Sequence, residues 1–215
     1  MSKLDVESSQ TVVLASSSVY RRQLLTRLGI PFVVVSPNFD ERWLDPETPS
    51  GYVQRLAEMK AGAVRHHYPD ALIIASDQVA VLDGQVLRKP GSREANIEQL
   101  LRASGRRVQI LTSLCVLNTR TGCTQVDTVL ATVHFRSLSL HQIECYVSRE
   151  QPFDCAGGFK SEGLGVALFS RVDVDDSSTI VGLPLIPLVR MLENEQLDVL
   201  STSLAAPLSQ YPHRA

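Results

Sequence analysis

The chain has 215 residues, of which 44% are hydrophobic and 20% are charged. A chain of this length can bury a substantial core, in one large domain or in two closely joined lobes. The formal net charge of −2 excludes a general electrostatic attraction to nucleic acid or to anionic membranes, so any bound anion must be held by a local cluster of cations. No apolar run approaches the roughly 20 residues that cross a bilayer, and we expect neither a membrane span nor a signal peptide.

Strand and helix signals alternate over residues 11–198, between polar segments 1–10 and 199–215 that we expect to be flexible tails. Without repeats or long linkers, this mixture predicts a single α/β domain with a mixed sheet. In chain order, apolar runs and helical periodicity predict a strand at 12–15, a helix at 18–28, a strand at 32–35, a loop at 36–49, a helix at 51–67, a strand at 72–75, a hairpin turning at Asp83-Gly84, a helix at 93–103, long strands at 108–118 and 124–135, and helices at 139–147 and 184–192.

The four cysteines form no C-x-x-C pair, and no pair of histidines at metal-ligand spacing accompanies them. We therefore expect no zinc site, and a reduced protein of the cytoplasm is the simplest interpretation. The chain also lacks a G-x-x-x-x-G-K-[ST] element and a G-x-G-x-x-G element, which argues against a P-loop NTPase and a dinucleotide oxidoreductase.

The segment ASSSVYRRQLL at residues 15–25 places Arg21 and Arg22 in the first turn of a predicted helix. Helix starts carry partial positive charge, so cations are unfavourable there. An anion bound by free backbone N–H groups and serine hydroxyls would remove the conflict, because the arginines would then clamp it. The alternative is that Ser18 caps the helix and the arginines face solvent or pair with acids.

Cations and acids recur at other element ends. Lys60 lies in a predicted helix, Lys89 follows the hairpin, and Lys160 lies in a glycine-rich loop. Asp77 closes the predicted strand 72–75, and strand ends are where α/β proteins place reactive groups. Carboxylates beside such cations suit metal-assisted phosphate chemistry. Each residue alone has a plainer explanation, such as a turn cap for Asp77.

Seven segments occur together in a known order: ASSSVYRR, Asp40-Glu41, EMKA with Lys60, Ser76-Asp77-Gln78, Lys89-Pro90, KSEG at 160–163 and GLP at 182–184. With them the chain resembles the Maf family of nucleoside triphosphate pyrophosphatases. The resemblance implies an elongated mixed β-sheet with flanking helices and two lobes around a cleft, as in the inosine triphosphatase fold. It also implies hydrolysis between the α- and β-phosphates, a divalent cation (Mg²⁺, with Mn²⁺ or Co²⁺ as alternatives) and a homodimer.

At the matching positions, the resemblance implies that Asp77 accepts the proton of the attacking water and that Glu41 and Asp77 bind the metal. The residues implied to hold the phosphates are Ser16, Ser18, Arg21, Lys60, Lys89 and Lys160.

The subfamily is indicated by Gln78 after the aspartate, where many members carry Thr, by Tyr20 before the arginines, and by Glu162 in KSEG. This combination resembles the members that hydrolyse 7-methyl-GTP, although a close member has Trp in place of Tyr20. A 7-methylated guanine is positively charged, which suits an aromatic face and a carboxylate, and Gln78 offers both a donor and an acceptor. The plainer alternative is that Tyr20 only packs and Glu162 pairs with Lys160.

Two other functions stay open. One is a pyrophosphatase of the same fold that acts on dTTP, UTP or another nucleotide. The other is a non-catalytic nucleotide-binding regulator of cell division. In each case we expect a nucleoside triphosphate ligand and no nucleic-acid or membrane partner.

Overall fold

A seven-stranded mixed sheet forms the centre of the computed structural model, which describes residues 10–201. Most of both predicted tails (1–9 and 202–215) therefore lies outside the described residues. The strand order is β2-β1-β3-β5-β6-β7, with β4 also paired to β3; β1 runs parallel to β2 and β3, and the other pairs are antiparallel. The strands are β1 (Thr11–Ala15), β2 (Val33–Val35), β3 (Ala71–Leu82), β4 (Gln85–Leu87), β5 (Arg107–Asn118), β6 (Thr124–Phe135) and β7 (Phe169–Asp173).

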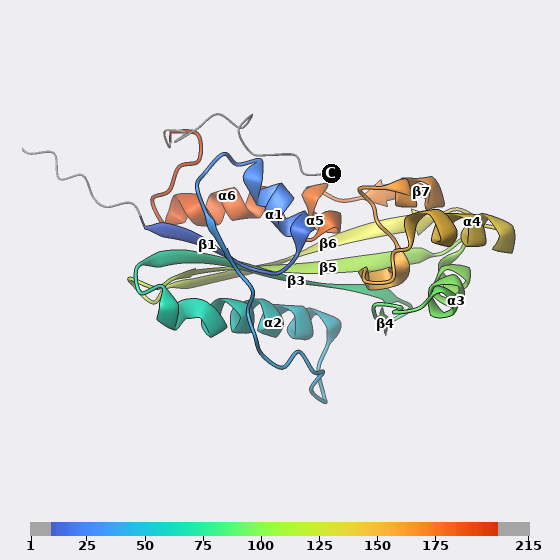
Figure 1. Cartoon of the computed structure of the whole chain (residues 1–215), viewed down its shortest axis with the longest axis horizontal. Coiled ribbons are helices and arrows are strands. Elements are labelled where there is room, and N and C mark those ends of the chain that lie inside the picture. Colours follow the sequence, from blue (N-terminus) through green and yellow to red (C-terminus); the bar gives the residue numbers. More distant parts are fainter. Residues whose placement is uncertain (1–9, 202–215) are drawn as a thin grey trace, which may run out of the picture.

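Helices cover both faces of this sheet. In Figure 1, α2 lies along one face, α1, α5 and α6 lie on the other, and α3 and α4 gather at the far end of the long strands. The helices are α1 (Val19–Thr26), α2 (Pro49–Val64), α3 (Arg93–Ala103), α4 (Leu140–Glu150), α5 (Ser178–Val181) and α6 (Leu185–Asn194), with short 3₁₀ turns at Arg65–His67, Ala156–Gly158 and Leu164–Leu168. None of the helices in the described range is long and apolar enough to cross a membrane.

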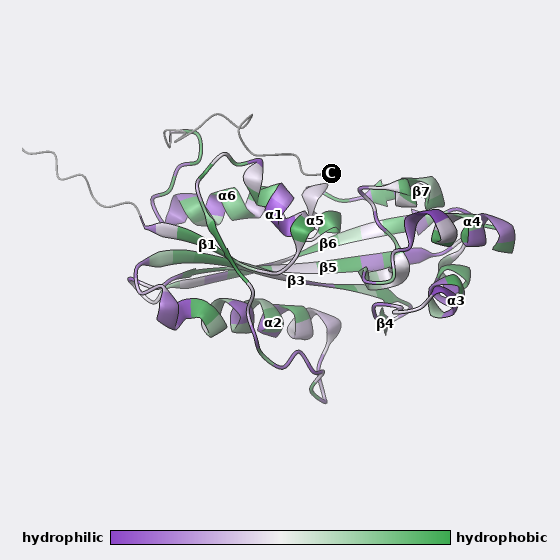
Figure 2. Ribbon diagram, in the orientation of Figure 1, coloured by the Kyte–Doolittle hydropathy of each residue, from purple (hydrophilic) through white to green (hydrophobic). Residues whose placement is uncertain are grey.

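The sheet is elongated because β3, β5 and β6 each have 12 residues, or about 40 Å of extended chain. Figure 2 shows hydrophobic strands between helices of mixed character. The core is divided along this length. One cluster, which includes Leu100, Ile143 and Phe159, packs around α3 and α4, whereas others, built around Leu14 and Ile73, flank the β1 end. These separate cores make two lobes on one sheet, which confirms the predicted fold class.

The prediction that a strand ends before Asp77 is wrong. β3 continues to Leu82, and Asp77 lies in the middle of it, opposite Ser113 of β5. Polar residues at 76–78 look like a strand end in the sequence. The strand continues because β5 pairs with β3 without interruption from Leu72 to Val81.

The remaining predicted elements agree with the structure to within a few residues. The helix predicted to start at Gly51 begins at Pro49, because Thr48 caps it by accepting a hydrogen bond from the Gly51 N–H at 3.1 Å. The strand β7 and the helix α5 were not predicted, since both are short and lie in a polar segment with no strong periodicity.

Candidate active site

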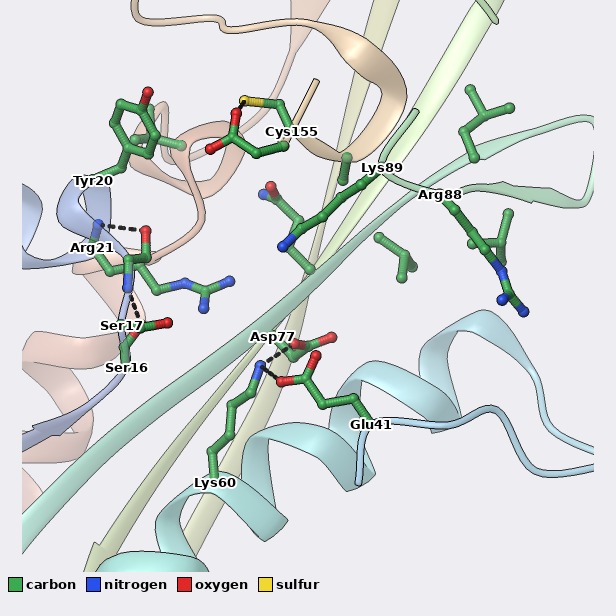
Figure 3. Close-up of a pocket in the computed structure, with 18 of the residues that line it drawn as sticks. Ser16, Ser17, Tyr20, Arg21, Glu41, Lys60, Asp77, Arg88, Lys89 and Cys155 are labelled. Atoms are coloured by element: carbon green, nitrogen blue, oxygen red, sulfur yellow. Dashed lines mark hydrogen bonds and ion pairs between the residues drawn. The ribbon is translucent and has the colours of Figure 1, made fainter. Parts of the chain in front are cut away.

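A cavity of about 820 Å³ opens where the edge of β3 is left uncovered. On this edge, β1 pairs with β3 only as far as Ile74, and β4 begins pairing at Ala80. No described strand covers residues 75–79 on that side. The polar segment Ser76-Asp77-Gln78 thus faces a gap between the lobes, and both lobes contribute to the cavity wall. Figure 3 shows the side chains that converge there.

The serine-rich turn after β1 forms one side of the cavity. The Ser16 hydroxyl accepts a hydrogen bond from the Ser18 N–H at 3.1 Å, and the Ser18 hydroxyl caps α1 by accepting one from the Arg21 N–H at 3.3 Å. Ser18 therefore caps the helix, as the alternative explanation of this segment predicts. These two contacts use only the hydroxyl oxygens of Ser16 and Ser18 as acceptors. Both hydroxyl hydrogens remain for an acceptor in the cavity, as an anion site requires.

Arg21 is directed into this cavity, whereas Arg22 is exposed and lies outside its wall. The Arg21 Nε donates to the backbone oxygen of Gly182 at 2.8 Å, and the Ser76 hydroxyl donates to the same oxygen at 2.8 Å. Burial lowers the pKa of Arg21, while the nearby carboxylates of Asp77 and Glu41 act in the opposite direction. The guanidinium is thus held through one nitrogen, and its terminal nitrogens face the cavity.

The centre of the site is a cluster of three charged side chains. Lys60 of α2 forms an ion pair with Asp77 Oδ1 and a second with Glu41 Oε1 at 3.3 Å. The side chains of Lys60 and Asp77 are only 8% and 10% exposed, whereas that of Glu41 is 55% exposed. Among the described residues, Asp77 Oδ2 receives no hydrogen bond. Asp77 therefore has one anchored oxygen and one free oxygen beside the cavity.

Glu41 lies in a loop that α2 holds in place. The Tyr52 hydroxyl donates to the Glu41 backbone oxygen at 2.8 Å, and the Trp43 ring stacks on Tyr52 with 4.7 Å between centroids. Arg55 donates to both carboxylate oxygens of Glu47, at 2.7 and 2.9 Å, and to the backbone oxygen of Arg42 at 3.1 Å. These contacts at Glu41 and just after it hold the backbone from which its carboxylate projects.

The other lobe supplies Lys89, Ser161 and Glu162 to the wall. Lys160 does not join them: its Nζ donates to the backbone oxygen of Glu150 at 3.2 Å and lies 3.8 Å from the Glu150 carboxylate. The structure thus brings together every predicted site residue except Lys160. The predicted alternative pair of Glu162 with Lys160 is not formed either, since Glu162 instead accepts a hydrogen bond from the Ser161 hydroxyl.

Tyr20 and Cys155 lie at the opposite side of the cavity from Arg88 (Figure 3). Burial raises the pKa of Tyr20, an effect that Lys160 opposes. Burial also raises the pKa of Cys155 to about 12, so its thiol stays protonated at neutral pH and is a poor nucleophile. This end of the cavity therefore provides an aromatic ring and hydrogen-bonding groups rather than a reactive thiolate.

Several wall residues were not predicted, among them Trp43, Tyr52 and Arg88. Arg88 directly precedes Lys89, and this pair of cations after a hairpin was the available signal. Tyr52 and Lys60 lie eight residues apart, which is about two turns of α2. Their spacing in the sequence could therefore have predicted that both side chains lie on the same side of this helix.

Comparison with known proteins decides the family. Residues 11–195 match the Maf-like protein family. The chain belongs to the Maf family. It is 53% identical over 189 residues to a protein of Pseudomonas syringae pv. tomato, 54% identical over 188 residues to one of Pseudomonas putida, and 51% identical over 193 residues to one of Alcanivorax borkumensis, each named 7-methyl-GTP pyrophosphatase. The matches cover 87–90% of this chain and 98% of each relative.

Among solved structures, this Maf protein is similar to the Staphylococcus aureus Ham1 protein, with a TM-score of 0.51 and 20% identity. The alignment covers 86% of the chain and all of the Ham1 chain. At this identity the likeness concerns the fold alone, and it agrees with the predicted two-lobed architecture.

Proposed function

We propose that this Maf protein hydrolyses 7-methyl-GTP to 7-methyl-GMP and pyrophosphate. The observation that carries the proposal is the convergence of Asp77, Lys60, Glu41 and Arg21 in one cavity, together with relatives of about 50% identity that bear this activity in their names. Other nucleotide pyrophosphatases share the need for such a cluster. The preference for 7-methyl-GTP rests on the relatives and on the groups at the base end.

Asp77 is the proton acceptor in the proposed reaction. Its free Oδ2 takes a proton from a water molecule, and that water attacks the α-phosphorus. Lys60 holds the other oxygen, so the carboxylate keeps its orientation. Arg21, Lys89 and the hydroxyls of the α1 start bind the phosphate oxygens, because charge neutralisation and alignment provide most of the catalysis in phosphoryl transfer.

A divalent cation fits the residues present. Glu41 and Asp77 converge on a single ammonium group, and the exposed Glu41 side chain can turn towards the cavity. The described part of the chain contains no group of three potential metal ligands. Mg²⁺ is commonly held by one or two carboxylates together with substrate phosphates, so we propose that it is bound with the nucleotide, with Mn²⁺ and Co²⁺ as substitutes. When bound, it would neutralise charge on the leaving pyrophosphate.

The base end suits a cationic purine. The Tyr20 ring provides a π-face, and Glu162 and Asp154 place carboxylates in the same part of the wall. Both features favour the positive charge that methylation at N7 gives guanine. Neutral GTP gains less from them.

A nucleotide panel tests the proposal. Purified protein with Mg²⁺ is assayed for pyrophosphate release from 7-methyl-GTP, GTP, dTTP and UTP. We expect the highest kcat/KM for 7-methyl-GTP. A preference for dTTP or UTP would move the protein to another specificity class, and ligand-induced thermal stabilisation without pyrophosphate release would favour the regulatory alternative.

The cytoplasmic location and the homodimer stay predictions. All four cysteines are free, which agrees with a reducing compartment.

A further inference from the structure

Gln78 reaches the cavity from β3 with its side-chain amide fixed on the side of α5. The Gln78 Nε2 has three acceptors within hydrogen-bond distance, which share its two hydrogens: the Thr112 hydroxyl at 2.8 Å and the backbone oxygens of Thr179 at 2.8 Å and Ile180 at 3.2 Å. Thr112 lies opposite Gln78 on β5 and is fully buried. Its hydroxyl donates to the Thr179 oxygen at 3.0 Å.

These contacts allow only one orientation of the amide. Backbone carbonyls accept hydrogen bonds and cannot donate them. Because Thr112 uses its hydrogen on Thr179, its oxygen is left as an acceptor towards Gln78. A flipped amide would place Gln78 Oε1 against these oxygens and leave buried acceptors without donors, which is costly.

The Gln78 Oε1 is therefore the part of the amide that remains for a ligand. This oxygen has no hydrogen-bond partner among the described residues, and it is not one of the fully buried atoms that lack a partner. Gln78 also lines the cavity, so a ligand can reach the oxygen. The amide thus offers an acceptor and no donor. This replaces the expectation, drawn from the sequence, that Gln78 presents both.

We propose that Thr112 is a positioning residue that makes Gln78 select substrates carrying an N–H donor on the facing edge of the base. The inference rests on the proposed function. The base of 7-methyl-GTP has two such donors on its Watson–Crick edge, the ring N1–H and the exocyclic amino group. Gln78 Oε1 and the Glu162 carboxylate both lie in the cavity wall as acceptors for an edge of this kind.

The test compares 7-methyl-GTP with two analogues that each lack one donor: 7-methyl-ITP, without the amino group, and 1,7-dimethyl-GTP, with N1 blocked. Wild-type protein should disfavour at least one analogue. In Thr112→Val, which removes the hydroxyl at constant shape, we expect this discrimination to fall about threefold to tenfold, the range that one neutral hydrogen bond provides. The loss should appear in KM rather than kcat, and Thr112→Ser should restore it.

Thr132→Val is the matched control. Thr132 lies partly buried on the neighbouring strand β6, outside the cavity wall, and its hydroxyl forms no hydrogen bond within the described residues. A ratio of two substrates in one preparation is independent of the folded fraction. If Thr112→Val does not fold, Thr112→Ala supplies the same comparison, and Gln78→Met tests the selecting amide itself. In addition, the ¹⁵N–¹H signals of the Gln78 side chain should shift in Thr112→Val and not in Thr132→Val.

The outcomes separate the two proposals. Wild-type protein that does not hydrolyse 7-methyl-GTP overturns the proposed function. If the protein hydrolyses it but Thr112→Val keeps the wild-type discrimination, the role of Thr112 is overturned and the activity stands. Unchanged discrimination in Gln78→Met overturns selection by Gln78 as well.

Discussion

Asp77 and Gln78 are neighbours on β3, but their side chains point to opposite faces of the sheet. On the α2 face, Asp77 belongs to an ionic cluster with Lys60 and the largely exposed Glu41. On the α5 face, Gln78 belongs to a neutral network with Thr112 and backbone carbonyls. The half-exposed pair of Lys60 with Glu41 can exchange for substrate charges, whereas a buried network of fixed donors and acceptors does not rearrange easily. The alternation of the strand thus separates the proposed proton acceptor, Asp77, from the amide proposed for selection, Gln78.

The largest expected effect comes from a substitution in the ionic cluster that leaves the Gln78 network unchanged. Asp77→Asn keeps the shape but removes the basic oxygen, so turnover of 7-methyl-GTP should fall by about 10²–10⁴, the usual contribution of a positioned general base. The measurement is pyrophosphate release at saturating substrate, with a thermal melt to establish folding. A rate within a few-fold of wild type would remove Asp77 from the mechanism.

A smaller effect is expected from loosening the loop that carries Glu41. Arg55→Met removes the pair with Glu47 and the bond to the Arg42 carbonyl. If Glu41 binds Mg²⁺, losing this support should raise the Mg²⁺ concentration for half-maximal activity by about tenfold or more, as is typical for groups that orient a ligand. The control is Arg65→Met, an exposed arginine just beyond α2.

This variant also sharpens the comparison between the two faces. Arg55→Met should leave the discrimination between 7-methyl-GTP and its donor-lacking analogues unchanged. A change in that ratio, with unchanged Mg²⁺ dependence, would show that the loop acts on base selection rather than on the ionic cluster.

The smallest effect concerns Tyr20 at the base end. A cation–π contact contributes roughly 0.5–2 kcal/mol, so Tyr20→Ala should raise the KM for 7-methyl-GTP by about threefold to thirtyfold and that for GTP by less. Tyr20→Trp should preserve the preference or strengthen it. Equal losses for both nucleotides in steady-state assays would mean that the ring does not sense the charge of the base.

Much of the fold was predictable because its signals are local. Stretches rich in β-branched and other apolar residues marked β5 and β6. Ser92 and Ser139 cap α3 and α4, as capping preferences predict. The exceptions depended on pairing partners. The polar residues at 76–78 continue β3 only because β5 runs alongside them, and β7 is short enough to need β6 as its template.

The sequence by itself determined the identities and order of the charged groups, and these were enough to indicate the family and a polyphosphate site. Only the tertiary structure decided how each group is oriented. It turned Lys160 towards Glu150, attached Lys60 to Asp77, and fixed the Gln78 amide through Thr112, which lies 34 residues away. The physical reason is that a polar side chain takes its orientation from the nearest donor or acceptor in space, and the strand pairing that brings those partners together leaves no local pattern in the sequence.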